Sequence, residues 1–267
     1  MSLTRTAARL ALYQALLTDP VVTAICGDAI YDSKIGNFSS REPVPVVILS
    51  TEGAKGEAWN PQNGGPPFNE LCGITFETAL RAVEFDEAGQ IVGYATPITD
   101  REMEATLDAL EDRLLWIVSG QDPIARAPRA EVRAVRKVVR RLVRYESERF
   151  TAEDIGEKLA IRLTTAQVEL VGEEAPVSIW DTPTGSFAGL PDPLRTICAG
   201  QPEGSSGYET CRLIASKYPV PAPPSGAGTQ PATVGLVIAP QPLAPGVPPI
   251  GPGQNPPETG LVVPLGG

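Results

Sequence analysis

Hydrophobic positions recur at helical spacing over residues 99–120, and this is the strongest periodic pattern in the chain. The apolar stripe consists of Met103, Leu107, Leu110, Leu114, Ile117 and Val118. Thr99 and Glu102 match a capping box at the start of the helix, and Gly120 supplies a left-handed stop at its end. A helix of about 20 residues spans ~30 Å, and its stripe must lie on another apolar surface. We therefore expect a helix that lies across an antiparallel sheet.

Two helices are predicted before the first strand. Residues 3–18 place their apolar side chains on one helical face. Asp19 is a suitable N-cap for a second, short helix that has Pro20 at its first position and is closed by Gly27. Residues 28–33 then fit a strand.

The next segments follow strand and turn patterns. Residues 44–51 form an apolar, β-branched run, and residues 71–85 alternate between apolar and polar positions, so we expect a strand in each. The glycines and prolines of residues 52–67 predict a long loop between them, and residues 86–93 predict a turn.

Residues 133–149 are ambiguous, because their valines fit both a helical face and a strand face. We favour a strand that begins near Val138, since residues 158–170 alternate clearly and residues 152–156 suit a turn. The two strands would form a closing hairpin. The expected fold class is α+β: an antiparallel or mixed sheet packed by a long helix and an N-terminal helix.

The C-terminal third differs in composition. From Glu173 onward the chain has 19 of its 28 prolines and 14 of its 26 glycines, and no charge lies between Lys217 and Glu258. Such a tract favours extended, polyproline-like backbone. We therefore expect an α+β domain over residues 1–172, and over residues 173–267 an extended arm that docks on neighbouring subunits or partner proteins. Residues 234–240 and 261–265 would be its apolar anchors.

Charge is distributed unevenly. The formal net charge is −10, but residues 126–149 contain nine Lys or Arg against three Glu, a local +6, so the remainder sums to −16. A basic strip on an acidic body argues against a general nucleic-acid binder. The strip either meets acidic surfaces of partner proteins or is a solvated face balanced by the chain's own acids. Its members are Arg133, Arg136, Lys137, Arg140, Arg141 and Arg144.

The sequence contains no histidine, which removes the commonest general base and metal ligand. The four cysteines form no CxxC pair, so we expect no metal and no cofactor. Cys198 and Cys211 are close enough in sequence to pair, but we expect free thiols in a protein made in a cytosol. No signal peptide or membrane-spanning run is visible. We expect a non-enzymatic protein with no catalytic residues.

Two tryptophans and the acids of the long helix remain as candidates. Trp59 in the predicted loop and Trp180 beyond the domain suit interface anchors or caps of the local core, whereas Trp116 is assigned to packing. The helix acids are expected to form a solvated outer face rather than a metal or acid-base site: Glu102, Glu104, Asp108, Glu111 and Asp112. The interface candidates are Trp59, Arg133, Arg136, Arg140, Arg144 and Trp180.

The order of these segments resembles the tail-terminator family of long-tailed bacteriophages and gene transfer agents. The resemblance rests first on ALYQALLTDPVVTAICGDAIYDS and PVPVVILSTEG, within residues 7–53. It continues more weakly through ITFETALRA, EATLDALEDRLL and the final strand pair to about residue 170. The long C-terminal arm departs from the family, so no role for the arm is carried over.

The resemblance implies a homo-hexameric ring that caps the tail tube, stops its polymerisation and joins it to a head-completion or neck protein. Genomic DNA would pass through the ring without sequence-specific binding, and the protein would be made in the host cytoplasm and reside in the virion. The alternatives are another neck ring, such as a tail-completion or head-closure subunit, and a non-viral binding module with a proline-rich arm.

Overall fold

A computed structural model describes residues 3–33, 45–58, 60, 62, 64–65, 68–80, 84–85, 91–93, 100–125, 127–154, 157–173 and 184–218, which all belong to one compact unit, Met1–Ala222. The elements in chain order are α1 (Thr4–Leu17), α2 (Pro20–Cys26), β1 (Ile30–Asp32), β2 (Val46–Ala58), β3 (Phe68–Leu80), β4 (Glu84–Phe85), β5 (Ile91–Gly93), α3 (Asp100–Val118), α4 (Ala130–Arg136), β6 (Val139–Asp154), β7 (Glu157–Leu170), α5 (Leu194–Ala199) and α6 (Ser206–Ala215). The predicted α+β class is confirmed.

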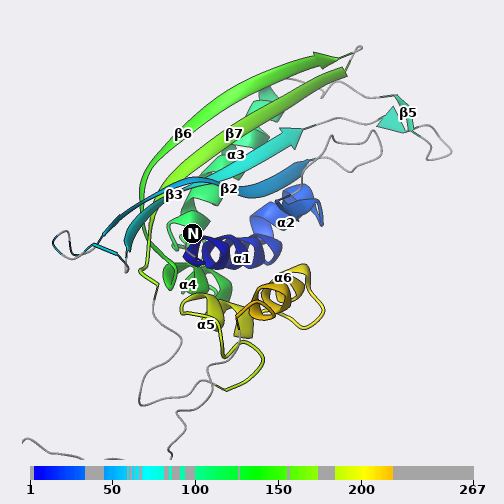
Figure 1. The fold of residues 1–267 in the computed structure, drawn as a ribbon. Helices are drawn as coiled ribbons and strands as arrows, with labels where there is room; N and C mark the ends of the chain where they lie inside the picture. The colour runs from blue at the N-terminus through cyan, green and yellow to red at the C-terminus, as the bar shows by residue number, and fades with distance from the viewer. Residues whose placement is uncertain are drawn as a thin grey trace, which may run out of the picture. The chain divides into compact units, whose positions relative to one another are not determined.

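One five-stranded sheet organises the unit, in the order β1-β2-β3-β7-β6. The three pairs from β2 to β6 are antiparallel, and only β1 runs parallel to its neighbour β2. The helices lie on one side of the curved sheet, with α1 beneath its centre (Figure 1). Strands β4 and β5 form a separate two-stranded sheet. The residues predicted as a turn after β3 therefore contain a short strand, β5.

The two N-terminal helices have the predicted bounds and caps. The Asp19 carboxylate accepts hydrogen bonds from the backbone N–H groups of Val21 and Val22 at 3.0 Å, which satisfies donors that the first turn of α2 leaves free. Pro20 occupies the first turn of α2, and Gly27 follows its end with φ of 55°. The predicted strand at residues 28–33 is β1, which pairs with the beginning of β2.

Helix α3 buries the predicted stripe. Its described stripe residues are fully buried: Leu107, Leu110, Leu114, Ile117 and Val118. Gly120 ends the helix with φ of 66°, and a Cβ at this position would also collide with the side chain of Arg136. Thr99, which the capping-box prediction requires, lies outside the described residues.

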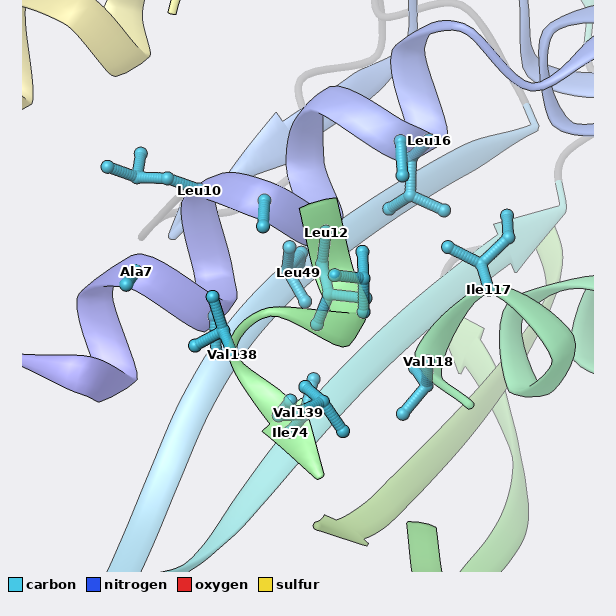
Figure 2. Close-up of a cluster of buried hydrophobic side chains, with 14 of the residues drawn as sticks. Ala7, Leu10, Leu12, Leu16, Leu49, Ile74, Ile117, Val118, Val138 and Val139 are labelled. Atoms are coloured by element: carbon cyan, nitrogen blue, oxygen red, sulfur yellow. The ribbon is translucent and has the colours of Figure 1, made fainter. Parts of the chain in front are cut away.

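The core lies between the helices and one face of the sheet. Alternate residues of β3 and β7 point toward the helices, among them Ile74, Phe76, Ala166 and Val168, all of which have no exposed surface. Figure 2 shows the side chains of α1 meeting those of β2, β3, α3 and the start of β6. The alternating apolar residues of β3 and β7 and the apolar faces of α1 and α3 therefore pack together in a single core.

Strand β2 is longer than predicted. It continues through residues 52–58, and its register pairs Lys55 with Leu71 and Ala58 with Phe68. The predicted loop at 52–67 is therefore wrong for residues 52–58. Glycines weaken a strand taken alone. Here the backbone hydrogen bonds to β3 hold the segment extended.

The ambiguous segment contains both structures. Helix α4 ends at Arg136, and β6 begins at Val139, close to the predicted start at Val138. Strand β6 then pairs with β7 in the predicted hairpin. Two register shifts interrupt the pairing near its start, so that Arg140 and Val143 are extra residues on β6. These are β-bulges, which bend a strand and increase its local twist.

The prediction of an extended arm from residue 173 is wrong for residues 184–218. Helices α5 and α6 form here, and Leu194, Ile197 and Phe187 belong to the same core as α1.

The prediction of free thiols at Cys198 and Cys211 is also wrong, because the two form a buried disulfide between α5 and α6. The cross-link and the apolar residues overcome the effect of the surrounding prolines and glycines. Residues 219–267 lie outside the described residues.

Candidate functional site: open sheet edges and a basic groove

The basic strip continues from α4 into β6, and three of its arginines, Arg136, Arg140 and Arg141, line a common surface, whereas Lys137 faces α1 and α5. Arg133 and Arg136 lie in the last turn of α4, and Arg140 and Arg144 follow on β6. All four side chains are exposed. Arg133 and Arg136 make no ion pair with any described residue. Trp59 and Trp180, the other predicted interface residues, lie outside the described residues.

Part of the strip is neutralised within the chain. Arg141 and Arg140 donate hydrogen bonds to the two carboxylate oxygens of Glu169 on β7, at 2.7 and 3.0 Å. The bond from Arg141, and with it that from Arg140, holds the pKa of Glu169 below its usual value despite the opposing effect of burial. Among the described residues, the ion-pair partner of Arg144 is Glu146, at the long distance of 3.9 Å. Balance by the chain's own acids therefore applies to Arg140 and Arg141, and contact of the other arginines with a partner protein stays a prediction.

A groove of about 600 Å³ lies beside this strip, and we call it the α3–β6 groove. Three arginines and one acid line it: Arg136, Arg140, Arg141 and Asp112. Its apolar side is formed by Leu115, Trp116, Leu142 and Tyr145. Trp116, which was assigned to packing, is only partly buried and faces this groove, while 53% of Tyr145 is exposed. The groove thus combines positive charge with two aromatic rings.

Strand β6 is also an open edge of the sheet. Over the described residues, β7 is its only strand neighbour, so one row of its backbone N–H and C=O groups has no strand partner. Three of the large exposed hydrophobic side chains lie on it: Val143, Tyr145 and Phe150. An edge of this length with exposed apolar side chains is suited to pairing with another chain.

The opposite edge of the sheet is open as well. Strand β1 covers only Val47, Ile48 and Leu49 of β2. From Ser50 to Ala58, no described strand lies on the outer side of β2. Near this edge the exposed charges are Asp28, Glu52, Lys55 and Glu57, a majority of acids. These acids are opposite in sign to the arginines at the beginning of β6, whereas Glu146 and Glu148 are exposed further along the same strand.

A buried ion cluster joins α2, α3 and α4. Arg113 of α3 contacts Asp19 at 2.6 Å and Asp122 at 2.7 Å, and Arg129 contacts the same two acids at 2.6 and 3.0 Å. Both carboxylates are completely inaccessible to solvent. Burial by itself would raise the pKa of Asp122, but the hydrogen bonds and charges of Arg113 and Arg129 outweigh it and lower the pKa. The cluster has a structural role, since every carboxylate is already paired.

Arg113 was not singled out from the sequence, although a signal was present. Its position, three residues after Leu110, places it beside the apolar stripe of the helix. Burial by itself would lower the pKa of its guanidinium, but the hydrogen bonds to Asp19 and Asp122 raise it. An arginine on an apolar face is a sign that buried acids lie nearby.

The prediction that the acids of α3 form a solvated outer face is wrong for three of them. Arg162 of β7 donates hydrogen bonds to Asp108 at 2.5 Å, to Glu111 at 2.9 Å and to Glu104 at 3.1 Å. Arg149 of β6 also pairs with Glu104. These contacts fasten α3 to the far end of the β6–β7 hairpin. Asp112, in contrast, is exposed as predicted.

The described residues hold no group of three or more Cys, Asp or Glu side chains arranged to bind a metal ion. The two free thiols lie in the core, and burial raises the pKa of Cys26 to about 12. Burial, assisted by the charge of Glu70, raises the pKa of Cys72 to about 11. Neither thiol is therefore a nucleophile at neutral pH. Among the described helices, none has the length and apolar character to cross a membrane.

The chain was compared with protein-family models, curated proteins and solved structures. No protein-family model matches the sequence, and no curated protein matches it. The chain is similar to a chain in a solved structure described as the virion of a native gene transfer agent (GTA) particle. The sequence identity is 18%, the TM-score is 0.33, and the match covers 60% of this chain and 93% of that chain. A likeness at this level does not assign a function.

Proposed function

We propose that the chain is a non-catalytic structural subunit of a phage-type particle: a tail terminator that forms a homo-hexameric ring. The ring would cap the tail tube, stop its polymerisation and join it to a neck protein. The observation that carries this proposal is the pair of open edges on one sheet, at β6 and at Ser50–Ala58 of β2.

The directions of the two edge strands suit a ring. Three antiparallel pairings separate β2 from β6, so the two strands run in opposite directions. A rotation about an axis along the strands leaves strand direction unchanged. The β6 edge of one copy would therefore meet the β2 edge of the next as an antiparallel pair, which satisfies both rows of backbone groups. Such a head-to-tail contact closes into a ring when the rotation closes.

Charge supports the same pairing. Arg144 is exposed near the beginning of the β6 edge and Arg136 lines a groove together with Arg140 and Arg141 of that strand, whereas Glu52 and Glu57 lie at the β2 edge. Opposite charges on two edges of one chain favour contact between different edges of two copies over contact between identical edges. This selects a head-to-tail arrangement.

The sequence resemblance adds the biological context. The segments that resemble tail terminators form α1, α2, β1, β2, β3, α3, β6 and β7 in the expected order. In this proposal the partners are the tail tube protein and a head-completion or neck protein. Genomic DNA passes through the lumen without sequence-specific binding. The protein is made in the host cytoplasm and then resides in the tail or neck of the virion. No cofactor is required.

The mass of the purified full-length protein tests the ring. We expect light scattering to give six times the 28.2 kDa chain mass, and electron microscopy to show a sixfold ring with an open centre. Val143→Lys with Phe150→Lys places two cations on the exposed β6 edge, where lysine opposes strand pairing. Because these side chains are 48% and 46% exposed, the variant should fold normally and remain a monomer.

Leu213→Lys is the matched control. Leu213 is 66% exposed on α6, so the control introduces a lysine at an exposed apolar position on a helix and not on an edge strand, and it should keep the ring. A wild-type protein that stays monomeric at every concentration would refute the proposal. A ring that also survives the double β6 variant would refute the edge-to-edge arrangement. Another neck ring would give the same mass and would be distinguished by the neighbour it contacts.

A further inference from the structure

Lys55 and Glu57 of the β2 edge lie on the face of the sheet that is turned away from the helices. Their partners on β3 are Leu71 and Asn69, which alternate with the core residue Cys72. Residues directly opposite each other in an antiparallel pair share a face. Both charged side chains are exposed, so this edge presents a positive and a negative charge two residues apart.

Arg144 and Glu146 of the β6 edge lie on the same face of the sheet. Their partners on β7 are Gln167 and Thr165, which alternate with the core residue Ala166. The two charged side chains are 68% and 70% exposed, and they contact each other at the long distance of 3.9 Å. The β6 edge therefore also presents a positive and a negative charge two residues apart.

We infer that Lys55 of one copy lies opposite Glu146 of the next copy in the proposed ring, and that Glu57 lies opposite Arg144. This inference rests on the proposed function, and it adds the register of the contact between copies. In an antiparallel pair, an advance of two residues along β2 meets a step back of two residues along β6. One register therefore joins both unlike pairs on the same face.

Charge selects this register among its neighbours. The side-chain period of a strand is two, so only shifts by an even number of residues keep the faces matched. A shift of two in one direction would place Glu57 opposite Glu146, and a shift of two in the other direction would place Lys55 opposite Arg144. Like charges directly opposite each other are destabilising, whereas unlike pairs are stabilising.

The helix-facing side of the two edges fits the same register. Tyr145 is 53% exposed and would lie opposite Gly56, where the missing side chain leaves room for its ring. Phe68 of β3 lies against Gly56 and is 42% exposed, so the two aromatic rings could pack together. The register shifts within β2 and β6 fall outside residues 54–57 and 144–147, so these residues can pair without a bulge in either strand.

Paired cysteines in the full-length protein test the register. Lys55→Cys and Glu146→Cys are combined in one chain, and the oxidised protein is separated on a non-reducing gel. Within one chain, β3 and β7 keep the two positions three strand spacings apart, ~14 Å, which is too far for a disulfide. We expect covalent multimers of up to six copies. A mixture of the two single variants should give covalent dimers only, because each copy then carries one new thiol at one edge.

The matched controls combine Lys55→Cys with Arg144→Cys or with Glu148→Cys. These pairs are directly opposite only in the two shifted registers. In the inferred register they are diagonal neighbours at ~7–8 Å, so their cross-link yield should be about tenfold lower. A ring that cross-links best through a shifted pair, or through none of the three, would overturn the register and leave the ring intact. A protein that light scattering shows to be monomeric would overturn the ring and the register together.

An exchange of charges provides a second test. Lys55→Glu and Glu146→Lys each place like charges opposite each other, so each should raise the concentration at which the ring dissociates by about tenfold or more. The two substitutions in one chain restore an unlike pair and should bring assembly back to within about threefold of wild type. Glu203→Lys is the matched control, because it makes the same charge change at an exposed acid between α5 and α6, and it should have no effect. A double variant that assembles no better than either single variant would overturn the inferred register.

Discussion

Two arginine-rich regions of this protein lie close together in sequence but differ in burial and in pairing. In the buried ion cluster, Arg113 is 4% exposed and contacts two acids that have no access to solvent. In the basic strip, Arg140, Arg141 and Arg144 are 56–69% exposed, and their acid partners are fewer than the arginines. The first region holds helices together. The second leaves positive charge at the surface.

The two regions differ in the free energy that is needed to break their ion pairs. A buried pair cannot be broken without leaving an uncompensated charge in a medium of low polarity, so its loss is expensive. An exposed pair exchanges its partner for water and contributes little to stability. Substitutions in the two regions should therefore separate stability from association, and the following experiments probe that separation.

The largest effect is expected at Arg113. Arg113→Met keeps most of the side-chain volume but leaves Asp19 and Asp122 with Arg129 as the one cation that contacts them among the described residues. The free energy of unfolding should fall by about 3–5 kcal/mol, as measured by urea denaturation. Arg133→Met, in the basic strip, should change it by no more than ~0.5 kcal/mol. If the two substitutions lowered the free energy of unfolding by the same amount, the proposed difference between the buried cluster and the basic strip would be wrong.

A smaller effect is expected at Arg162, which occupies an intermediate environment. Its side chain is 10% exposed, but its partner Asp108 is 66% exposed and can be solvated when the arginine is lost. Arg162→Met should therefore cost about 2 kcal/mol, less than the loss of a wholly buried pair. Arg149→Met removes only the exposed contact to Glu104 and should cost less than ~1 kcal/mol. If Arg162→Met cost as much as Arg113→Met, burial would not determine the ranking.

The smallest effect is a pH dependence at Asp122. Its pKa in the folded protein lies below the ordinary value of 3.8, so the stabilisation it contributes is complete above that value and is lost as pH falls further. Asp122→Asn should lose about 1.5 kcal/mol at neutral pH relative to wild type. The difference should shrink between pH 4 and about pH 2 in urea titrations. Asp28→Asn, at an exposed acid, should show no such trend, and a constant difference for Asp122→Asn would contradict the pairing.

The elements with strong local signals were predictable from sequence. The stripe of α3, the Asp19–Pro20 start of α2 and the alternation of β7 each depend on spacing within a few residues. Local spacing is visible in a sequence because it fixes which side chains share a face. The α+β class followed from these elements.

The elements that were missed depend on distant partners. Residues 52–58 are extended because β3 pairs with them, and α5 is stable because Leu194 and Ile197 enter the core beside α1. The serine cap of α6 at Ser205 was a local signal, but it lies in a tract whose average composition predicts extended backbone. The average composition of residues 173–267 therefore did not indicate the two short helices α5 and α6.

The candidate site was predictable only in part. The surplus of arginines over residues 126–149 indicated a basic surface, and the structure places Arg133, Arg136, Arg140 and Arg144 on it. The sequence did not indicate that Trp116 and Tyr145 would meet across a groove, since they come from α3 and β6. Nor did it indicate which strand would be outermost, because sheet order depends on contacts between residues far apart in the chain.

The bulges at Arg140 and Val143 have a consequence for the solubility of the protein before assembly. A regular, unbulged edge strand would pair with almost any extended peptide and would promote aggregation. The two bulges near the start of β6 interrupt the regular spacing of backbone N–H and C=O groups on which non-specific strand pairing depends. In the proposed ring, only a counterpart strand with matching curvature would fit along the whole of β6, so the bulges would disfavour non-specific pairing of this strand with other chains.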